Sequence, residues 1–182
     1  MKNYSLILTM TCFVFSSASA ELPAWEFQTA ADLSAWVPNA QLSNVEVKDG
    51  AVHAEAIDWD PFFHNRSVTI PAAPWQYVLL RIKADRPGLG ELFWSGQLEG
   101  QYGGLSQSKS IGFSVRDTKD WQKIAVFPFW HTEGTIRQLR LDLYNEGRFE
   151  IDRIAILEKG IIVKDLKTTE GTLKELQSYF AV

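Results

Sequence analysis

The stretch AIDWDPFFHN, from Ala56 to Asn65, sets two acids and a histidine among three aromatic residues. Asp58 and Asp60 are two residues apart, so on a strand their side chains would point the same way. Glycoside cleavage uses two carboxyl groups on either side of a sugar, and Glu99 or Glu133 could supply the second group across a cleft. Carboxylates beside aromatic rings also bind sugar hydroxyls without any chemistry.

Metal and nucleophile chemistry has less support in the sequence. The histidines are His53, His64 and His131, and none has the HExxH spacing of zinc proteases. His64 and His131 both fall in expected loops, where they could converge with Asp60 on a zinc ion. The sequence contains no Gly-x-Ser-x-Gly elbow and no glycine-rich phosphate loop between a strand and a helix.

All seven tryptophans lie after residue 20, and several stand beside turn residues. An aromatic ring can stack on the C–H face of a sugar, because it presents apolar area with few rotors to freeze. We expect such rings at a loop end of the fold, beside polar side chains that take the hydroxyl groups. The residues of this candidate surface are Trp59, Asp60, Phe62, Phe63, His64, Trp94, Trp130 and His131.

A second candidate surface is a sheet face. Arg140, Asp142 and Tyr144 form an outward row, which we expect beside Tyr77 and Arg81. Such a charged row is also typical of the solvated side of a half-buried sheet. The alternative for the tryptophans is that most of them close the ends of the core.

The first twenty residues have the pattern of a secretory signal peptide. An apolar run follows Lys2, and small residues precede the expected cleavage site after Ala20. We therefore expect a secreted or periplasmic protein. Cleavage would remove Cys12, the only cysteine, so the mature domain must depend on core burial or a bound ion.

The formal net charge of the chain is -4 at pH 7. Nucleic acids and anionic membrane surfaces both favour basic patches. No second apolar run approaches the length of a membrane span. Neither a nucleic-acid partner nor membrane insertion is expected.

Short apolar runs separated by turn signals recur along the chain, with no long helix between them. Parallel strands would need helical crossovers, so the pattern predicts an antiparallel β-sandwich of about nine strands. Asp49-Gly50 suits a tight hairpin, because both positions tolerate positive φ. The apolar phase of the last run changes at Asp152-Arg153, which predicts a β-bulge. The expected strands include 24–28, 44–48, 51–56, 67–70, 77–84, 91–95, 110–115, 122–127, 136–143 and 149–157.

The C-terminal residues differ in kind from the strands. Thr172 to Glu175 has capping-box spacing, and apolar residues recur there at helical intervals, so a short helix docked on the sandwich is expected. The expected organisation is a signal peptide at 1–20, a sandwich domain at 21–158 and a C-terminal extension with a short helix at 159–182.

The closing strands carry a family resemblance. The runs Trp130 to Leu143 (WHTEGTIRQLRLDL) and Phe149 to Leu157 (FEIDRIAIL) resemble the last strands of galactose-binding-like jelly-rolls. Trp25 to Phe27 and the Asp60-Pro61 step resemble the start of the same pattern. That superfamily includes many non-catalytic carbohydrate-binding modules of bacterial polysaccharide-degrading enzymes. The resemblance implies a jelly-roll sandwich that binds carbohydrate without cleaving it.

Modules of this kind often hold a structural calcium ion between the first and last strands. The matching positions are Glu26 and Asp152, which are acids within otherwise apolar strands. Calcium takes about six to eight oxygen ligands. The alternative is that Asp152 pairs with Arg153 or Arg148, or caps the bulge.

A second resemblance leads to another class of function. The runs Trp121 to Phe129 (WQKIAVFPF) and Gly147 to Ile154 (GRFEIDRI) are similar to the complex I intermediate-associated protein type of the same fold, which implies an assembly or interaction role. Three hypotheses follow. The preferred one is a secreted carbohydrate-binding protein, and the others are a small lyase or glycosidase using loop carboxylates such as Asp60, and a secreted protein-interaction domain.

Overall fold

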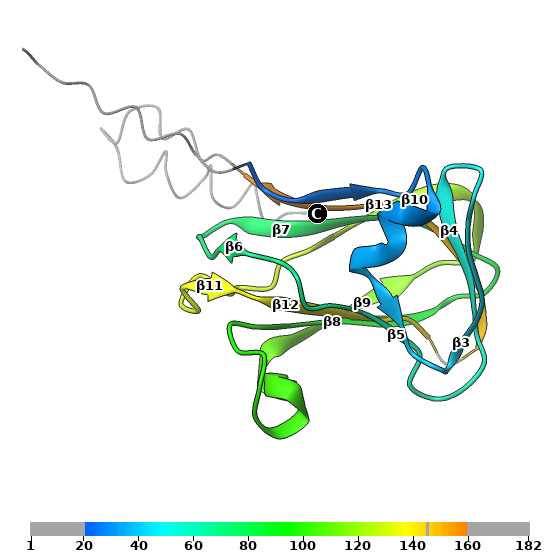
Figure 1. The fold of residues 1–182 in the computed structure, drawn as a ribbon. Helices are drawn as coiled ribbons and strands as arrows, with labels where there is room; N and C mark the ends of the chain where they lie inside the picture. Colours follow the sequence, from blue (N-terminus) through cyan, green and yellow to red (C-terminus); the bar gives the residue numbers. More distant parts are fainter. Residues whose placement is uncertain (1–20, 145, 160–182) are drawn as a thin grey trace, which may run out of the picture.

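The computed structural model describes residues 21–144 and 146–159. The expected signal peptide and C-terminal helix lie outside these residues. The described chain forms two stacked sheets, of six and five strands, with a small two-stranded sheet at one end (Figure 1). No helix within these two ranges is long and apolar enough to cross a membrane. The all-β sandwich predicted from the sequence is confirmed.

The six-stranded sheet has the order β10-β7-β13-β4-β3. β1 pairs with the second half of β13, past the end of β4. All its pairings are antiparallel. Its strands are β1 (Ala24–Glu26), β3 (Leu42–Lys48), β4 (Ala51–Ala56), β7 (Gln76–Ala84), β10 (Thr118–Val126) and β13 (Gly147–Glu158).

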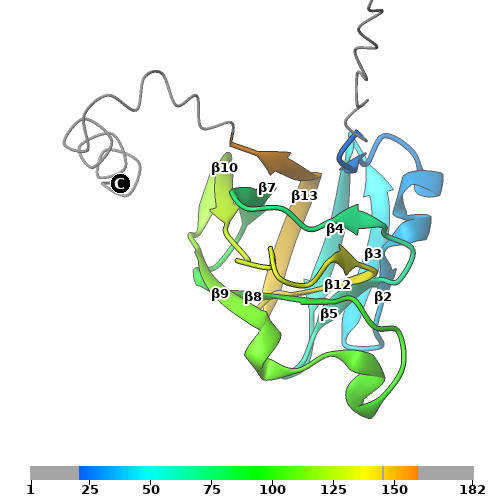
Figure 2. The same cartoon turned by 90° about the vertical axis from the view of Figure 1, so that its left-hand side faces the viewer.

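The five-stranded sheet has the order β2-β5-β12-β8-β9. It lies across the core from the larger sheet, with β9 on the side of β10 and β2 on the side of β3 (Figure 2). Its strands are β2 (Val37–Pro38), β5 (Phe62–Asn65), β8 (Gly88–Ser95), β9 (Ser110–Val115) and β12 (Gln138–Asp142). The remaining elements are the pair β6 (Ile70–Pro71) and β11 (Thr135–Ile136), and the 3-10 helices η1 (Ala30–Ala35), η2 (Gln101–Gly104) and η3 (Gln107–Lys109).

The strand order is that of a jelly-roll. Apart from the neighbouring pairs β3-β4 and β8-β9, the chain changes sheet from one main strand to the next. Strands neighbouring in space, such as β5 with β12 and β7 with β13, are therefore distant in sequence. The described residues contain thirteen strands where about nine were expected, because several are bridges of two or three residues. The expected strand at 136–143, for example, divides into part of β11 and β12.

Alternation along each strand decides which side chains fill the core. In β7, Val78, Leu80 and Ile82 are buried, while Arg81 and Lys83 point outward. Each fully buried aliphatic side chain contributes about 1.5–3 kcal/mol relative to an exposed one. This periodicity therefore stabilises one register, because a shift by one residue would place the charged side chains in the core.

Two local predictions are confirmed. Asp49 and Gly50 have φ of 52° and 78° and join β3 to β4 in a tight hairpin. The pairing of β13 with β7 shifts between Ile151 and Arg153, so the bulge lies where the apolar phase changes.

The fold differs from the sequence prediction around β5. Residues 62–65 form a strand, whereas a loop was expected after the Asp60-Pro61 step and a strand at 67–70. Phe63 and Asn65 are buried, and Phe62 and His64 point to the other side. Pro61 ends the preceding loop and does not prevent a strand, because extended backbone is compatible with proline at a strand start.

Candidate functional site

The outward surface of the five-stranded sheet carries the side chains best suited to recognise a ligand. Along β12, Leu139 and Leu141 are fully buried between the sheets, so Arg140 lies on the opposite side. The register places β5 on one flank of this row and β8 on the other. We call this surface the Arg140 face, and its residues are Phe62, His64, Glu91, Phe93, Gln138, Arg140 and Asp142.

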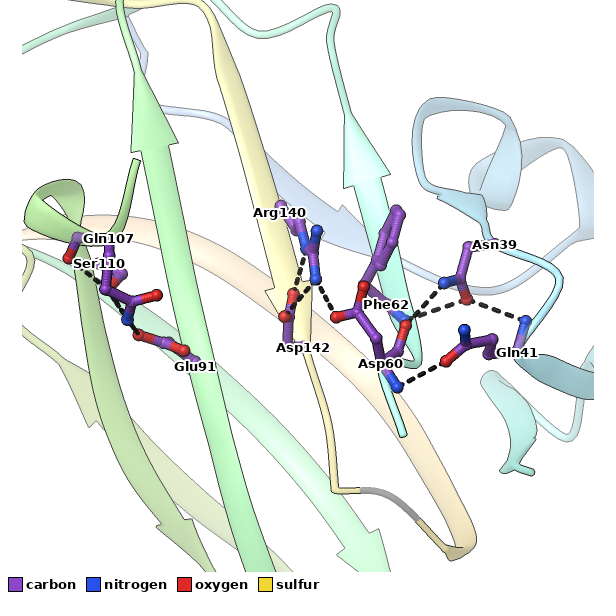
Figure 3. A network of polar contacts seen from close by, with 9 residues as sticks. All are labelled: Asn39, Gln41, Asp60, Phe62, Glu91, Gln107, Ser110, Arg140 and Asp142. Atoms are coloured by element: carbon purple, nitrogen blue, oxygen red, sulfur yellow. Dashed lines mark hydrogen bonds and ion pairs between the residues drawn. The ribbon is translucent and has the colours of Figure 1, made fainter. Parts of the chain in front are cut away.

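Arg140 is the centre of this face. Its Nε donates to Oδ1 of Asp142 at 2.7 Å, and its Nη2 donates to Oδ2 of Asp142 at 2.6 Å and to Oδ1 of Asp60. The guanidinium carbon lies 3.8 Å from the centroid of the Phe62 ring and 5.3 Å from that of Phe93. Two carboxylates and two rings therefore hold one cation in a single orientation. Figure 3 shows the two carboxylates and the Phe62 side chain beside Arg140.

The loop between β4 and β5 is held by amide side chains. Asn39 Nδ2 donates to the carbonyl of Asp60 at 2.7 Å, and the Asp60 N–H donates to Oε1 of Gln41 at 2.5 Å (Figure 3). Within the loop, the Trp59 N–H donates to Oδ1 of Asp58 at 2.8 Å. Trp59 is 72% exposed. A large apolar ring is thus presented to solvent on a backbone that is already ordered.

Trp59 forms part of a groove on this side of the molecule. The groove has a volume of about 640 Å³, and its lining includes Trp59, Leu89 and the acidic residues Asp60, Glu91 and Asp142. The Glu91 carboxylate accepts hydrogen bonds from Ser110 Oγ and Gln107 Nε2 (Figure 3). We call this groove the Trp59 groove.

His64 and Gln138 connect the Arg140 face to the loop between β8 and β9. Gln138 Nε2 donates to the carbonyls of Gln97 and Gly103, so its Oε1 must be the acceptor of the 2.8 Å bond to His64 Nε2. His64 therefore carries a proton on Nε2. The loop projects below the five-stranded sheet (Figure 1) and presents Tyr102, which is 80% exposed.

Burial shifts the titration of two groups on this face. Burial raises the pKa of the Asp142 carboxyl, and the nearby Asp60 and Glu91 raise it further, while the bonds from Arg140 oppose them. Burial also lowers the pKa of His64, against the bond to Gln138, and the charges of Arg66 and Arg140 lower it further. His64 is thus a neutral hydrogen-bond donor at neutral pH.

The expected loop-end surface is not assembled. Trp130 is 1% exposed, Phe63 and Trp94 are also buried, and the rings of Trp94 and Trp130 meet edge to face with centroids 6.2 Å apart. Trp130 Nε1 donates to Oε1 of Gln76 at 2.8 Å inside the core. These three aromatic residues fill the core, so the prediction that they line a ligand surface is corrected. His131 is exposed in the loop between β10 and β11, outside the residues that line the Trp59 groove.

The expected outward row also divides. Arg140 and Asp142 lie on the five-stranded sheet, whereas Tyr77 and Arg81 belong to β7 of the other sheet. Tyr144 is buried, and its hydroxyl donates to the carbonyl of Arg148 at 3.0 Å. Parity along a strand identified the outward residues, but it did not identify the sheet that carries them.

The two acids expected to hold calcium have arginine partners. Glu26 pairs with Arg153 at 3.0 Å and Asp152 with Arg81 at 2.8 Å. Burial raises the pKa of Asp152, although the surrounding cations Arg81, Lys83 and Arg153 oppose this. Positive charge beside both carboxylates does not fit a divalent cation that needs about six to eight oxygens. Among the residues that the structure describes, no three or more His, Cys, Asp or Glu side chains form a group that could hold a metal ion.

No protein-family model matches the sequence, and no curated relative does. Solved structures do match. The second N-terminal cellulose-binding domain of β-1,4-glucanase C from Cellulomonas fimi has a TM-score of 0.50 at 14% identity, over 80% of this chain and 100% of that domain. The chain has the jelly-roll fold of a carbohydrate-binding module. The C-terminal CBM6 of LamC, a marine laminarinase from Zobellia galactanivorans, matches at a TM-score of 0.49 and 15% identity, over 75% of this chain and 98% of that one.

Several residues on this side of the five-stranded sheet were missed by sequence reasoning. Glu91 and Phe93 lie in an expected strand, and alternation with the buried Leu92 was the signal that could have placed them outward. Gln138 and Tyr102 had no such signal. Their roles depend on a contact between β12 and a loop 35 residues earlier in the chain.

Proposed function

We propose that this protein is a secreted or periplasmic carbohydrate-binding module that holds a poly- or oligosaccharide in the Trp59 groove without cleaving it. The observation that carries the proposal is the exposure of Trp59 on an ordered loop at the edge of an open groove. An exposed tryptophan costs free energy in water and presents a flat apolar surface, which is the complement of the C–H face of a sugar ring.

The polar side chains beside the Trp59 ring supply the second requirement for binding a sugar, which is a set of acceptors for its hydroxyl groups. Asp60, Glu91 and Asp142 present carboxylate oxygens to the groove, and hydrogen bonds from neighbouring side chains hold each of them in place. Acceptors fixed before binding lose little conformational entropy when a sugar hydroxyl donates to them. Tyr102 offers a second exposed ring on the loop that projects from the same sheet.

The ion pairs favour binding over cleavage. Glycoside cleavage needs a carboxylic acid that donates a proton to the leaving oxygen. Both carboxylate oxygens of Asp142 and Oδ1 of Asp60 accept hydrogen bonds from Arg140, so these atoms face the guanidinium and not a leaving oxygen. This is the reason for preferring a non-catalytic module to a small glycosidase.

Affinity electrophoresis in gels containing soluble polysaccharides tests the proposal. We expect at least one polysaccharide to retard the mature protein and Trp59→Ala to abolish the retardation. Phe129→Ala is the matched control, because Phe129 is 69% exposed but follows β10 outside the groove. Loss of retardation in both variants, or in neither, would contradict a site at Trp59, and the absence of any retarding glycan would contradict carbohydrate binding.

A further inference from the structure

The Trp59 groove has an excess of negative charge. Three acidic residues, Asp60, Glu91 and Asp142, are among those that line it, and none of its lining residues is basic. These carboxylates act on one another, because Asp60 and Glu91 both raise the pKa of Asp142 in addition to its burial. An anionic group entering the groove would meet the same repulsion.

Arg140 offsets only part of this negative charge, and it has little capacity left to bind an anionic ligand directly. A guanidinium recognises a carboxylate through two parallel N–H groups. In Arg140 the pair formed by Nε and Nη2 is already bonded to Asp142, and Nη2 also donates to Asp60. The edge of the cation that would grip a uronic acid is therefore occupied by the protein's own carboxylates.

Arg86, whose charge acts on Tyr144 of the groove, pairs with Glu146 at 3.2 Å. Two other cations near this face also have partners. Arg66, which follows β5 beyond His64, donates through Nη2 to the carbonyl of Leu98. Lys109 of η3 pairs with Glu133 at 2.6 Å. Neither residue lines the groove.

We infer that the groove selects uncharged glycans and discriminates against those that carry carboxylate or sulfate groups along the chain. This inference rests on the proposed carbohydrate-binding function and narrows its substrate class. The discrimination is electrostatic, so it weakens as salt screens the carboxylates over a Debye length of about 10 Å at 0.1 M. Juxtaposed like charges at an interface oppose binding strongly, and we expect at least about a tenfold difference in affinity between matched neutral and acidic chains.

Oligosaccharide pairs that differ only at C6 test the inference. A glycan array would present β-1,4-linked glucose and mannose oligomers beside β-1,4-linked glucuronate and mannuronate oligomers, together with other neutral, uronate and sulfated chains. At low ionic strength, we expect every glycan that binds to be uncharged. A uronate or sulfated chain bound as tightly as its neutral counterpart would overturn the charge inference and leave carbohydrate binding standing. An array with no bound glycan would overturn both.

A variant with one acidic side chain made uncharged distinguishes electrostatic repulsion from the shape of the groove as the cause of the discrimination. Glu91→Gln keeps an acceptor for Ser110 and removes one negative charge from the groove. We expect it to raise the affinity for acidic analogues of the preferred glycan, measured relative to the affinity for the neutral glycan, at low salt. Glu46→Gln is the matched control, since Glu46 is exposed on the six-stranded sheet. Equal gains in both variants, or a gain in neither, would contradict repulsion by the groove.

Discussion

Arg140 and Asp142, two residues apart on β12, form a two-point ion pair on one face of the five-stranded sheet. Side chains at i and i+2 of a strand point the same way, so a single rigid element holds both partners. Asp60, from the loop before β5, joins the same guanidinium. The ion pair thereby connects β12, at the centre of the Arg140 face, to the loop that carries Trp59.

The first prediction concerns the removal of this cation. Arg140→Ala leaves Asp60 and Asp142 partly buried without their partner, so we expect the free energy of unfolding to fall by about 2–4 kcal/mol. Urea denaturation followed by tryptophan fluorescence measures the change. Arg140→Lys should recover only part of it, because an ammonium lacks the planar fork. An Arg140→Ala protein with unchanged stability would show that the network contributes nothing to the fold.

The second prediction concerns the loop between β8 and β9. Gln138→Leu leaves the carbonyls of Gln97 and Gly103 without their donor, so we expect faster amide exchange along residues 97–104. Hydrogen exchange followed by mass spectrometry measures this. A loss of stability of about 1–3 kcal/mol should accompany it.

Gln122 supplies the control for that experiment. It is also buried, in β10 of the six-stranded sheet, and it bonds both the N–H and the carbonyl of Arg116, in the loop between β9 and β10, at 3.1 and 2.7 Å. Gln122→Leu should cost a similar free energy and leave exchange at 97–104 unchanged. Similar exchange in both variants would mean that Gln138 acts only through global stability.

The third prediction concerns pH. Burial lowers the pKa of His64 in the native protein below its ordinary value of 6.5, so the unfolded chain binds a proton more readily. The free energy of unfolding should therefore fall as the pH drops from 6.5 through the native pKa, by at most about 1.4 kcal/mol per pH unit. His64→Gln, which can still donate to Gln138, should flatten the profile relative to a His53→Gln control. Parallel profiles for the two variants would exclude His64 as the source.

The fourth prediction concerns calcium. Glu26 and Asp152 are each paired with an arginine, so we expect neither added calcium nor a chelator to change the melting temperature. Differential scanning calorimetry of the mature protein measures this. A rise in melting temperature with calcium that Asp152→Asn abolishes would show that the ion displaces Arg81.

The fold could be predicted well where local chemistry and burial agree. The β7 strand alternates along its whole length, and Asp49-Gly50 matches the backbone that its hairpin requires. The bulge of β13 was visible as a change of apolar phase at Asp152-Arg153. The β5 strand was missed because the Asp60-Pro61 step favoured a loop, while the alternation of residues 62–65 is only four residues long.

The site could be predicted only in part, because a residue's type does not tell which side of a sheet it faces. Trp94 was placed among the ligand-binding aromatic residues, yet it lies in the core on the inward parity of β8. Trp59 and Arg140 were both candidates and do lie on the same side of the molecule, but on surfaces that the sequence kept separate. Their proximity depends on the pairing of β5 with β12, strands that are more than seventy residues apart.

Chemical-shift mapping tests most directly whether the Trp59 groove binds carbohydrate. The backbone amides and the Trp59 and Arg140 side-chain N–H groups would be followed by NMR during titration with a neutral oligosaccharide that the array identifies. We predict that the largest shifts occur at Trp59, Glu91 and β12, with saturation at one stoichiometric site. Shifts concentrated on the outward residues of the six-stranded sheet, such as Tyr77 and Trp121, would contradict a carbohydrate site in the Trp59 groove.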